Sequence, residues 1–98
     1  MKLIISSSVR DKLAKKSPPV QEHEIIQCFA NRTHKDLIDT REAHLTNPMT
    51  RWFISQTDYG RSLKISYIPT KDGIVIKSAY DPNTDEWRIF SDFTTPIN

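Results

Sequence analysis

The chain has 98 residues, the size of one domain with a modest core, and this size argues against a deep enclosed pocket. Its apolar share of 37% is low, but the apolar residues are grouped and periodic, which argues against disorder. The net charge of +2 permits a polyanionic partner without demanding one. A single cysteine, Cys28, excludes an intrachain disulfide and fits a reducing compartment. The apolar run Leu3–Ile5 is too short for a signal peptide or a membrane span. We therefore expect one domain over residues 1–98, in the cytoplasm.

The amino-terminal part predicts a short strand followed by a short helix. Residues 2–6 read as the strand, and the serines at 6–8 offer helix N-caps. Val9 and Leu13 stand four residues apart and would form one narrow apolar stripe. Pro18 should end the helix region, because the residue before a proline avoids the α conformation.

A second helix is expected from about Gln21 to Asn31. Ile25, Ile26 and Phe29 recur at helical spacing, and Cys28 reads as a small core residue. This helix is the natural cover for an apolar sheet face.

The stretch from Trp52 to Tyr80 organises the rest of the chain. It holds three β-rich runs separated by two turns, and the only two glycines, Gly60 and Gly73, fall in those turns. Pro69 should stop the middle strand, because proline cannot donate to a ladder. We expect an antiparallel three-stranded meander.

Side chains should alternate across the faces of this meander. In the middle strand one face carries Leu63, Ile65 and Tyr67, and the other carries Ser62, Lys64 and Ser66. In the last strand the alternation predicts one shared face for Ile74, Ile76, Ser78 and Tyr80.

The remaining segments are shorter. Residues 36–40 are compatible with a strand, and Thr84 can cap a terminal helix. A final strand over Trp87–Ser91 is the alternative to that helix, and the tail 93–98 should be loose. The predicted fold is α+β, with two N-terminal helices packed on a twisted antiparallel sheet and a short C-terminal helix.

The candidate chemical groups are cations, an imidazole, a carboxylate and a phenol. The three histidines lack metal-ligand spacing, and there is no glycine-rich phosphate loop. Fixed cations suit chemistry on a phosphodiester, because they stabilise charge on a phosphorane while a base moves protons. Each of these residues also has an ordinary structural reading, as a surface pair or a packed side chain. The candidates are Arg41, Glu42, His44, Arg61, Lys77 and Tyr80.

Five segments follow one another in a recognisable order along the chain: Lys15–Val20, Ile25–Phe29, Arg41–Ile54, Gly60–Ile65 and Ile74–Tyr80. This order resembles the BrnT-like toxins of the RelE/ParE superfamily, which belong to bacterial type II toxin–antitoxin systems. The match covers about residues 10 to 90. Two positions differ from the family pattern: Lys16-Ser17-Pro18 replaces a Lys-His-Gly turn, and Tyr80 replaces an arginine.

The resemblance implies a small toxin that cuts messenger RNA without a metal or other cofactor. It also implies a cognate DNA-binding antitoxin, with which the toxin would form a heterotetramer. For such a nuclease we expect a reaction in which a ribose 2′-hydroxyl attacks the adjacent phosphate, His44 or Glu42 acts as the base, and Arg41, Arg61 and Lys77 hold the phosphate. Tyr80 would stack on a base or donate a proton. The remaining RNA contacts are expected from Lys15, Lys16, Arg51 and Lys64. The alternative is a non-catalytic protein of the same fold that inhibits a protein target such as DNA gyrase, or only binds its partner.

Overall fold

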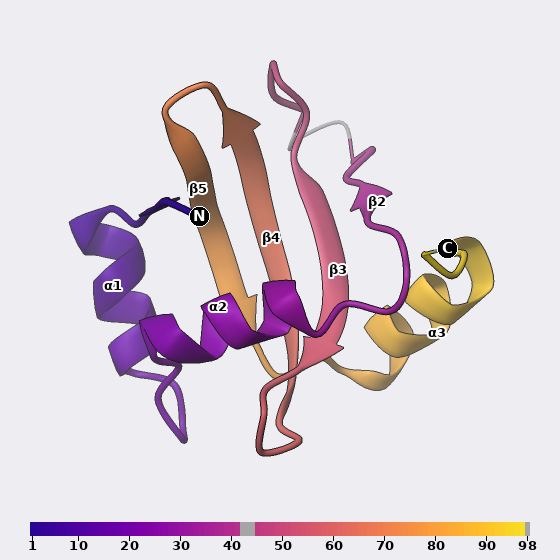
Figure 1. Cartoon of the computed structure of the whole chain (residues 1–98), viewed down its shortest axis with the longest axis horizontal. Helices are drawn as coiled ribbons and strands as arrows, with labels where there is room; N and C mark the ends of the chain where they lie inside the picture. The colour runs from indigo at the N-terminus through magenta and orange to yellow at the C-terminus, as the bar shows by residue number, and fades with distance from the viewer. Residues whose placement is uncertain (42–44, 98) are drawn as a thin grey trace.

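The computed structural model describes residues 1–41 and 45–97, and in these residues three helices pack against one five-stranded sheet (Figure 1). The strand order across the sheet is β1-β5-β4-β3-β2. The α+β class is therefore confirmed. In chain order the elements are β1 (Leu3–Ile4), α1 (Ser7–Ala14), α2 (Glu22–Ala30), β2 (Leu37–Ile38), β3 (Arg51–Gln56), β4 (Ser62–Thr70), β5 (Gly73–Tyr80) and α3 (Thr84–Phe93).

The centre of the sheet is the expected meander, since β4 pairs antiparallel with both β3 and β5. At one edge β2 pairs antiparallel with β3. At the other edge β1 runs parallel to β5, with Leu3 opposite Ile74. The sheet is thus mixed and not wholly antiparallel. Because no hairpin joins β1 to β5, no tight turn forces β1 to run antiparallel to β5.

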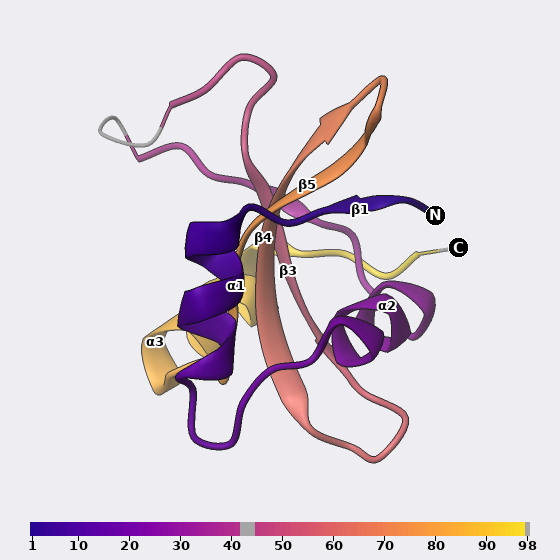
Figure 2. The same cartoon turned by 90° about the vertical axis from the view of Figure 1, so that its left-hand side faces the viewer.

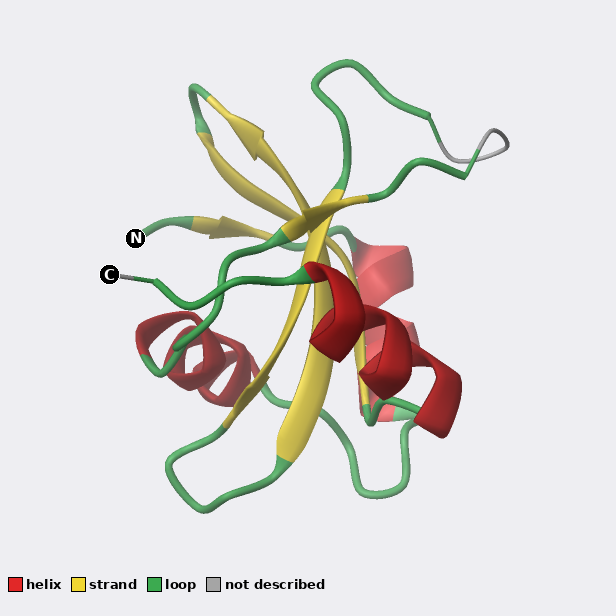
Figure 3. Cartoon of the chain, turned by 90° about the vertical axis from the view of Figure 1, so that its right-hand side faces the viewer, coloured by secondary structure: helices red, strands yellow, loops and turns green. Residues whose placement is uncertain are grey.

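The helices lie on both sides of the sheet. Helix α2 covers one face, whereas α1 and α3 lie on the opposite side (Figures 2 and 3). The two N-terminal helices therefore do not share a face, and residues 15–21 carry the chain past the end of the sheet between them. None of the helices in the described residues is long and apolar enough to cross a membrane.

The face beneath α2, here called the packed face, forms the centre of the core. The ring of Phe29 contacts those of Phe53 and Tyr67 edge to face, with centroids 4.9 and 5.1 Å apart. The Tyr67 hydroxyl donates to Asp36, and burial together with that hydrogen bond raises the pKa of Tyr67 to about 12. Burial likewise raises the pKa of the Cys28 thiol to about 12, so this thiol stays protonated.

A β-bulge in β5 corrects the predicted alternation. The register shifts between Ser66 and Tyr67, so that Ser66 lies opposite Ser78 while Tyr67 lies opposite Ile76. Lys77 is the extra residue on the β5 side. Ile76 therefore joins Tyr67 on the packed face, and Ser78 turns to the other face, here called the open face. The open face is defined by Trp52, Lys64, Ser66, Ser78 and Tyr80.

Both predicted glycine turns are confirmed, with φ of +89° at Gly60 and +149° at Gly73. Pro69, however, does not end β4, because it pairs with Ile74 and the strand continues to Thr70. Beyond Tyr67 the strand pairs only with β5, so one of its sides is an edge that tolerates proline.

The C-terminal element is a helix, which excludes the alternative final strand. Asn83 and Glu86 form its capping box: the Glu86 N–H donates to Asn83 Oδ1 at 2.8 Å, and the Asn83 N–H donates to Glu86 Oε1 at 3.0 Å. The tail is not loose over its described residues. Lys35 N–H donates to the Thr95 carbonyl at 2.8 Å, and Ile97 N–H donates to the Thr33 carbonyl at 2.9 Å. The tail is held because it pairs with a segment distant in the sequence.

Candidate functional site

The open face carries a polar cavity of about 380 Å³. Its walls come from the segment after β2, from the middle of β4 and from the bulge and end of β5. Each of these segments contributes a polar side chain, so the cavity gathers groups that lie far apart in the sequence. Its charged and phenolic lining includes Asp39, Arg41, Lys64, Lys77 and Tyr80.

Lys64 lies at the centre of this surface, although only 8% of the residue is exposed. Its ammonium is 3.0 Å from Glu86 Oε2 and donates to the Tyr80 hydroxyl at 3.2 Å. It also lies 4.8 Å from the centroid of the Trp52 ring. A carboxylate, a phenol and an indole face therefore replace the water that this cation loses on burial.

Tyr80 and Glu86 complete a three-membered polar network with Lys64. The Tyr80 hydroxyl donates to Glu86 Oε2 at 2.5 Å. Burial, followed by the bond to Glu86, raises the pKa of Tyr80, so the phenol stays protonated at neutral pH. Burial alone would raise the pKa of Glu86, but hydrogen bonds from Asn83, Tyr80 and Lys64 outweigh it and lower this pKa.

Arg41 forms the outer rim of the cavity. Its Nε and Nη2 donate to the two carboxylate oxygens of Asp39 at 3.0 and 2.8 Å. The Asp39 side chain is nearly buried, whereas 64% of the Arg41 side chain remains exposed. The hydrogen bond to Asp39 raises the pKa of Arg41. The Arg41 guanidinium is thus oriented by one carboxylate, while much of the side chain remains exposed to solvent.

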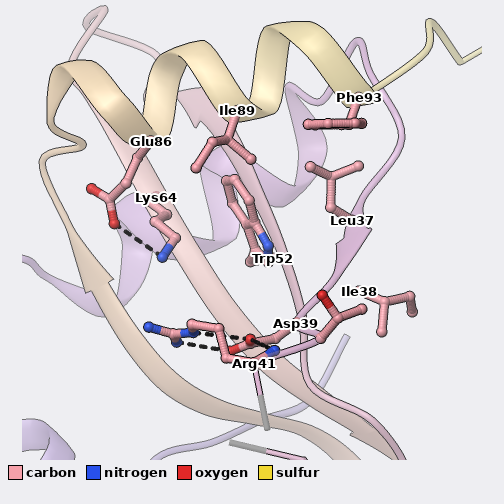
Figure 4. Close-up of a pocket in the computed structure, with 10 residues that line it drawn as sticks. Leu37, Ile38, Asp39, Arg41, Trp52, Lys64, Glu86, Ile89 and Phe93 are labelled. Atoms are coloured by element: carbon pink, nitrogen blue, oxygen red, sulfur yellow. Dashed lines mark hydrogen bonds and ion pairs between the residues drawn. The ribbon is translucent and has the colours of Figure 1, made fainter.

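A second cavity of about 540 Å³ adjoins the first and shares Asp39, Arg41 and Lys64 with it. Apolar side chains from β2, β3 and α3 form most of its walls, and Figure 4 shows Trp52 between the α3 residues and the Arg41–Asp39 pair. We call it the apolar groove and define it by Leu37, Ile38, Trp52, Ile89 and Phe93.

Several residues expected from the sequence meet at these two cavities. Arg41, Lys77, Tyr80 and Lys64 all line the polar cavity. The ammonium of Lys16 lies 5.3 Å from the Tyr80 ring centroid, so the helix-end lysine reaches the same surface. Lys15 is exposed beside it in the sequence. Glu42 and His44, the two expected bases, lie outside the described residues.

Arg61 is not part of the cavity lining. Its guanidinium donates to Asp81 Oδ1 at 2.8 Å and to the carbonyls of Pro18 and Pro19 at 2.8 and 2.7 Å. It also lies 3.4 Å from Glu24, and only 16% of its side chain is exposed. This arginine ties the segment between α1 and α2 to the end of β5.

Arg51 is also separate from the cavities, because it lies opposite Tyr67 on the packed face. The expected RNA contact by Arg51 therefore does not lie beside Lys64, which points to the other face. The alternation of side chains along β3 and β4 places the two cations on opposite sides.

Sequence reasoning missed three contributors: Asp39, Trp52 and Glu86. Asp39 stands two residues before Arg41, a spacing that permits the observed bidentate pair. Glu86 was expected in the first turn of α3, but it is the N3 residue because Asn83, and not the expected Thr84, caps the helix. Its contact with Lys64 is not local. Among the described residues, no three His, Cys, Asp or Glu side chains gather as a metal ion would require.

Comparison with known proteins identifies no relative: no family model matches the sequence, and neither a curated protein nor a solved structure matches the chain.

Proposed function

We propose that this protein is a metal-independent endoribonuclease of the toxin type, with the polar cavity as its phosphate site. The observation that carries the proposal is the convergence of Arg41, Lys64, Lys77 and Tyr80 on one cavity of the open face. Three cations and a protonated phenol there suit a phosphodiester that gains negative charge during reaction. The order of segments that resembles BrnT-like toxins supports the same class.

In the proposed reaction the ribose 2′-oxygen attacks the neighbouring phosphorus while a base takes the 2′-hydroxyl proton. Glu42 or His44 remains our candidate for that base. Arg41 and Lys77 hold the non-bridging oxygens, and Lys64 adds positive charge from the floor of the cavity. The bond from phosphorus to the 5′-oxygen then breaks, and Tyr80 donates a proton to that oxygen. The products are a 2′,3′-cyclic phosphate and a 5′-hydroxyl end.

The raised pKa of Tyr80 supports the role of proton donor over that of base, because the phenol stays protonated at neutral pH. Arg61 acts in this proposal as a positioning residue. By holding the Pro18 and Pro19 carbonyls, it fixes the segment that presents Lys16 to Tyr80.

A second candidate is a non-catalytic binding protein that inhibits a protein target or only binds an antitoxin. One observation favours it: Arg41 and Lys64 already have carboxylate partners in Asp39 and Glu86. Cations that are neutralised internally attract a polyanion less strongly than free ones. Under both candidates we propose a small cognate antitoxin as partner and a cytoplasmic location.

The two candidates differ in a cleavage assay with purified protein. A 5′-labelled single-stranded RNA of mixed sequence is incubated with the protein in excess EDTA, and the products are tested for a 2′,3′-cyclic phosphate end. The same RNA with 2′-O-methyl groups is the control, because it lacks the nucleophile. Cleavage of the first RNA alone supports the nuclease. Intact RNA, together with growth inhibition on expression, favours the binding protein.

A further inference from the structure

We infer that the apolar groove is a binding site for an unpaired nucleobase of the same RNA strand whose phosphate occupies the polar cavity. The inference rests on the proposed function and adds to it a place where one base of the RNA strand would bind. It starts from a feature that phosphate binding does not use: a mostly apolar groove beside a charged cavity.

The groove and the polar cavity adjoin. They share Asp39, Arg41 and Lys64 in their linings, so a ligand that contacts Arg41 or Lys64 in the polar cavity lies beside the groove. A nucleotide has the same division, with a charged phosphate at one end and a flat, largely apolar base at the other. The groove volume of about 540 Å³ lies within the range of pockets that enclose small organic ligands.

The walls of the groove have the chemistry that a base needs. Phe93 is 72% exposed and Ile89 is 39% exposed, although both lie on the groove. Figure 4 shows Phe93 near Leu37 at one end of the groove, with Trp52 nearer the cations. Aromatic faces beside a cationic track are the usual means of holding unpaired bases, because every base offers a π-face for stacking.

The groove also restricts the form of the RNA. A base can enter it only when that base leaves its stack and its pair, as in single strands, loops and ends. Trp52 already has Lys64 over its ring and the Phe90 ring 5.7 Å away. Phe93 is therefore the better exposed of the two aromatic surfaces for the incoming base.

Binding of uncleavable RNA tests the inference. Labelled 2′-O-methyl hexamers of A, C, G and U are titrated separately by fluorescence anisotropy, beside an abasic hexamer with the same phosphates. We expect the best homopolymer to bind roughly tenfold more tightly than the abasic strand, in line with stacking of one base. Phe93→Ala should remove most of that difference and leave abasic binding unchanged.

Two controls separate the base site from the phosphate site. Tyr59→Ala truncates an aromatic that is 95% exposed in the turn between β3 and β4, and it should leave all affinities unchanged. Lys77→Ala should weaken the base-containing and abasic strands by the same factor, because it removes only a phosphate contact.

Tryptophan fluorescence provides an independent readout. The chain has two tryptophans, so Trp87→Phe leaves Trp52 as the single emitter. We expect the best homopolymer, and not the abasic strand, to quench it.

Equal affinity of the wild type for abasic and base-containing strands would overturn the inference. An equal loss of affinity for both strands in Phe93→Ala would overturn it as well. If RNA is cleaved in EDTA but neither base effect appears, only the base site fails. If no strand binds and none is cleaved, the proposed function fails with it.

Discussion

The two faces of the sheet use the same strands for opposite purposes. On the packed face, Phe53 and Ile65 are fully buried beneath α2 within the apolar core, and the Arg32 guanidinium lies 5.2 Å from the Phe53 ring centroid. On the open face, Lys64 directly precedes Ile65 in β4. It is almost as well buried, but its charge needs Glu86 and Tyr80 as partners. Burial alone therefore does not distinguish Lys64 from the apolar side chains on the packed face.

What distinguishes the faces is how each buried group is compensated. The packed face gains chiefly from removing apolar area from water, which needs no particular partner, although the Tyr67 hydroxyl there requires Asp36. The open face holds charge that is tolerated only where hydrogen bonds and counter-charges are positioned by distant elements. The polar network of the open face therefore has stricter geometric demands than the packed face, and removal of single side chains tests the contrast.

The largest expected effect is on the packed face. Phe53→Ala leaves a cavity between Phe29 and Tyr67, and we expect the free energy of unfolding to fall by about 3–5 kcal/mol. Phe93→Ala is the matched control, because its ring is 72% exposed and its loss should cost about 0.5 kcal/mol or less. Urea titration measures both. An equal loss of unfolding free energy in the two variants would contradict this difference between the faces.

The next effect is on activity at the open face. Under the proposed function, Lys77→Ala should lower the rate of RNA cleavage by about 10²–10³, the usual loss for one electrostatic contact to a transition state. Lys77 is exposed, so the unfolding transition should not move. Lys71→Ala, an exposed lysine outside both cavities, should retain full activity. Wild-type rates in Lys77→Ala would exclude this lysine from the site.

The third effect concerns the turns that set the strand register, on which the difference between the faces depends. At Gly73 a Cβ atom would lie 2.8 Å from the Lys2 carbonyl oxygen, and φ is +149°. Gly73→Val should therefore destabilise the fold by about 1–3 kcal/mol. At Gly60 a Cβ atom would have no neighbour within 4 Å, so Gly60→Val suffers backbone strain alone. The melting temperature of Gly73→Val should be lower than that of Gly60→Val. The reverse order would contradict this interpretation of the turn.

The smallest expected effect is on the polar network and its pH dependence. Tyr80→Phe removes the hydroxyl bonded to Glu86 and Lys64, and it should cost about 0.5–1.5 kcal/mol at pH 7. The folded-state pKa of Glu86 lies below its ordinary 4.5, so its contribution is full above that pH and is lost as the pH falls through the folded value.

Loss of the Tyr80 donor should move the pKa of Glu86 upward, which a carboxyl NMR titration of both proteins measures. An unchanged Glu86 pKa in Tyr80→Phe would show that the hydroxyl does not stabilise the carboxylate.

Local signals in the sequence were enough to predict α2, the three central strands and both glycine turns, because periodicity, caps and positive φ act over a few residues. They were also enough to place Arg41, Lys77 and Tyr80 among the candidates, by residue type. They did not predict the bulge at Lys77, which turns Ser78 and Tyr80 away from the face of Ile76.

Only the tertiary structure decided which candidates meet. The acceptors of Arg61 come from α2, from the segment before α2 and from Asp81 just after β5. No local sequence pattern predicts that these groups bind one arginine. The same holds for Glu86 beside Lys64, for the parallel pairing of β1 and for the tail bound to residues 33–35. These contacts join residues far apart in the chain, and their geometry depends on the packing of the whole domain and not on the propensity of any one segment.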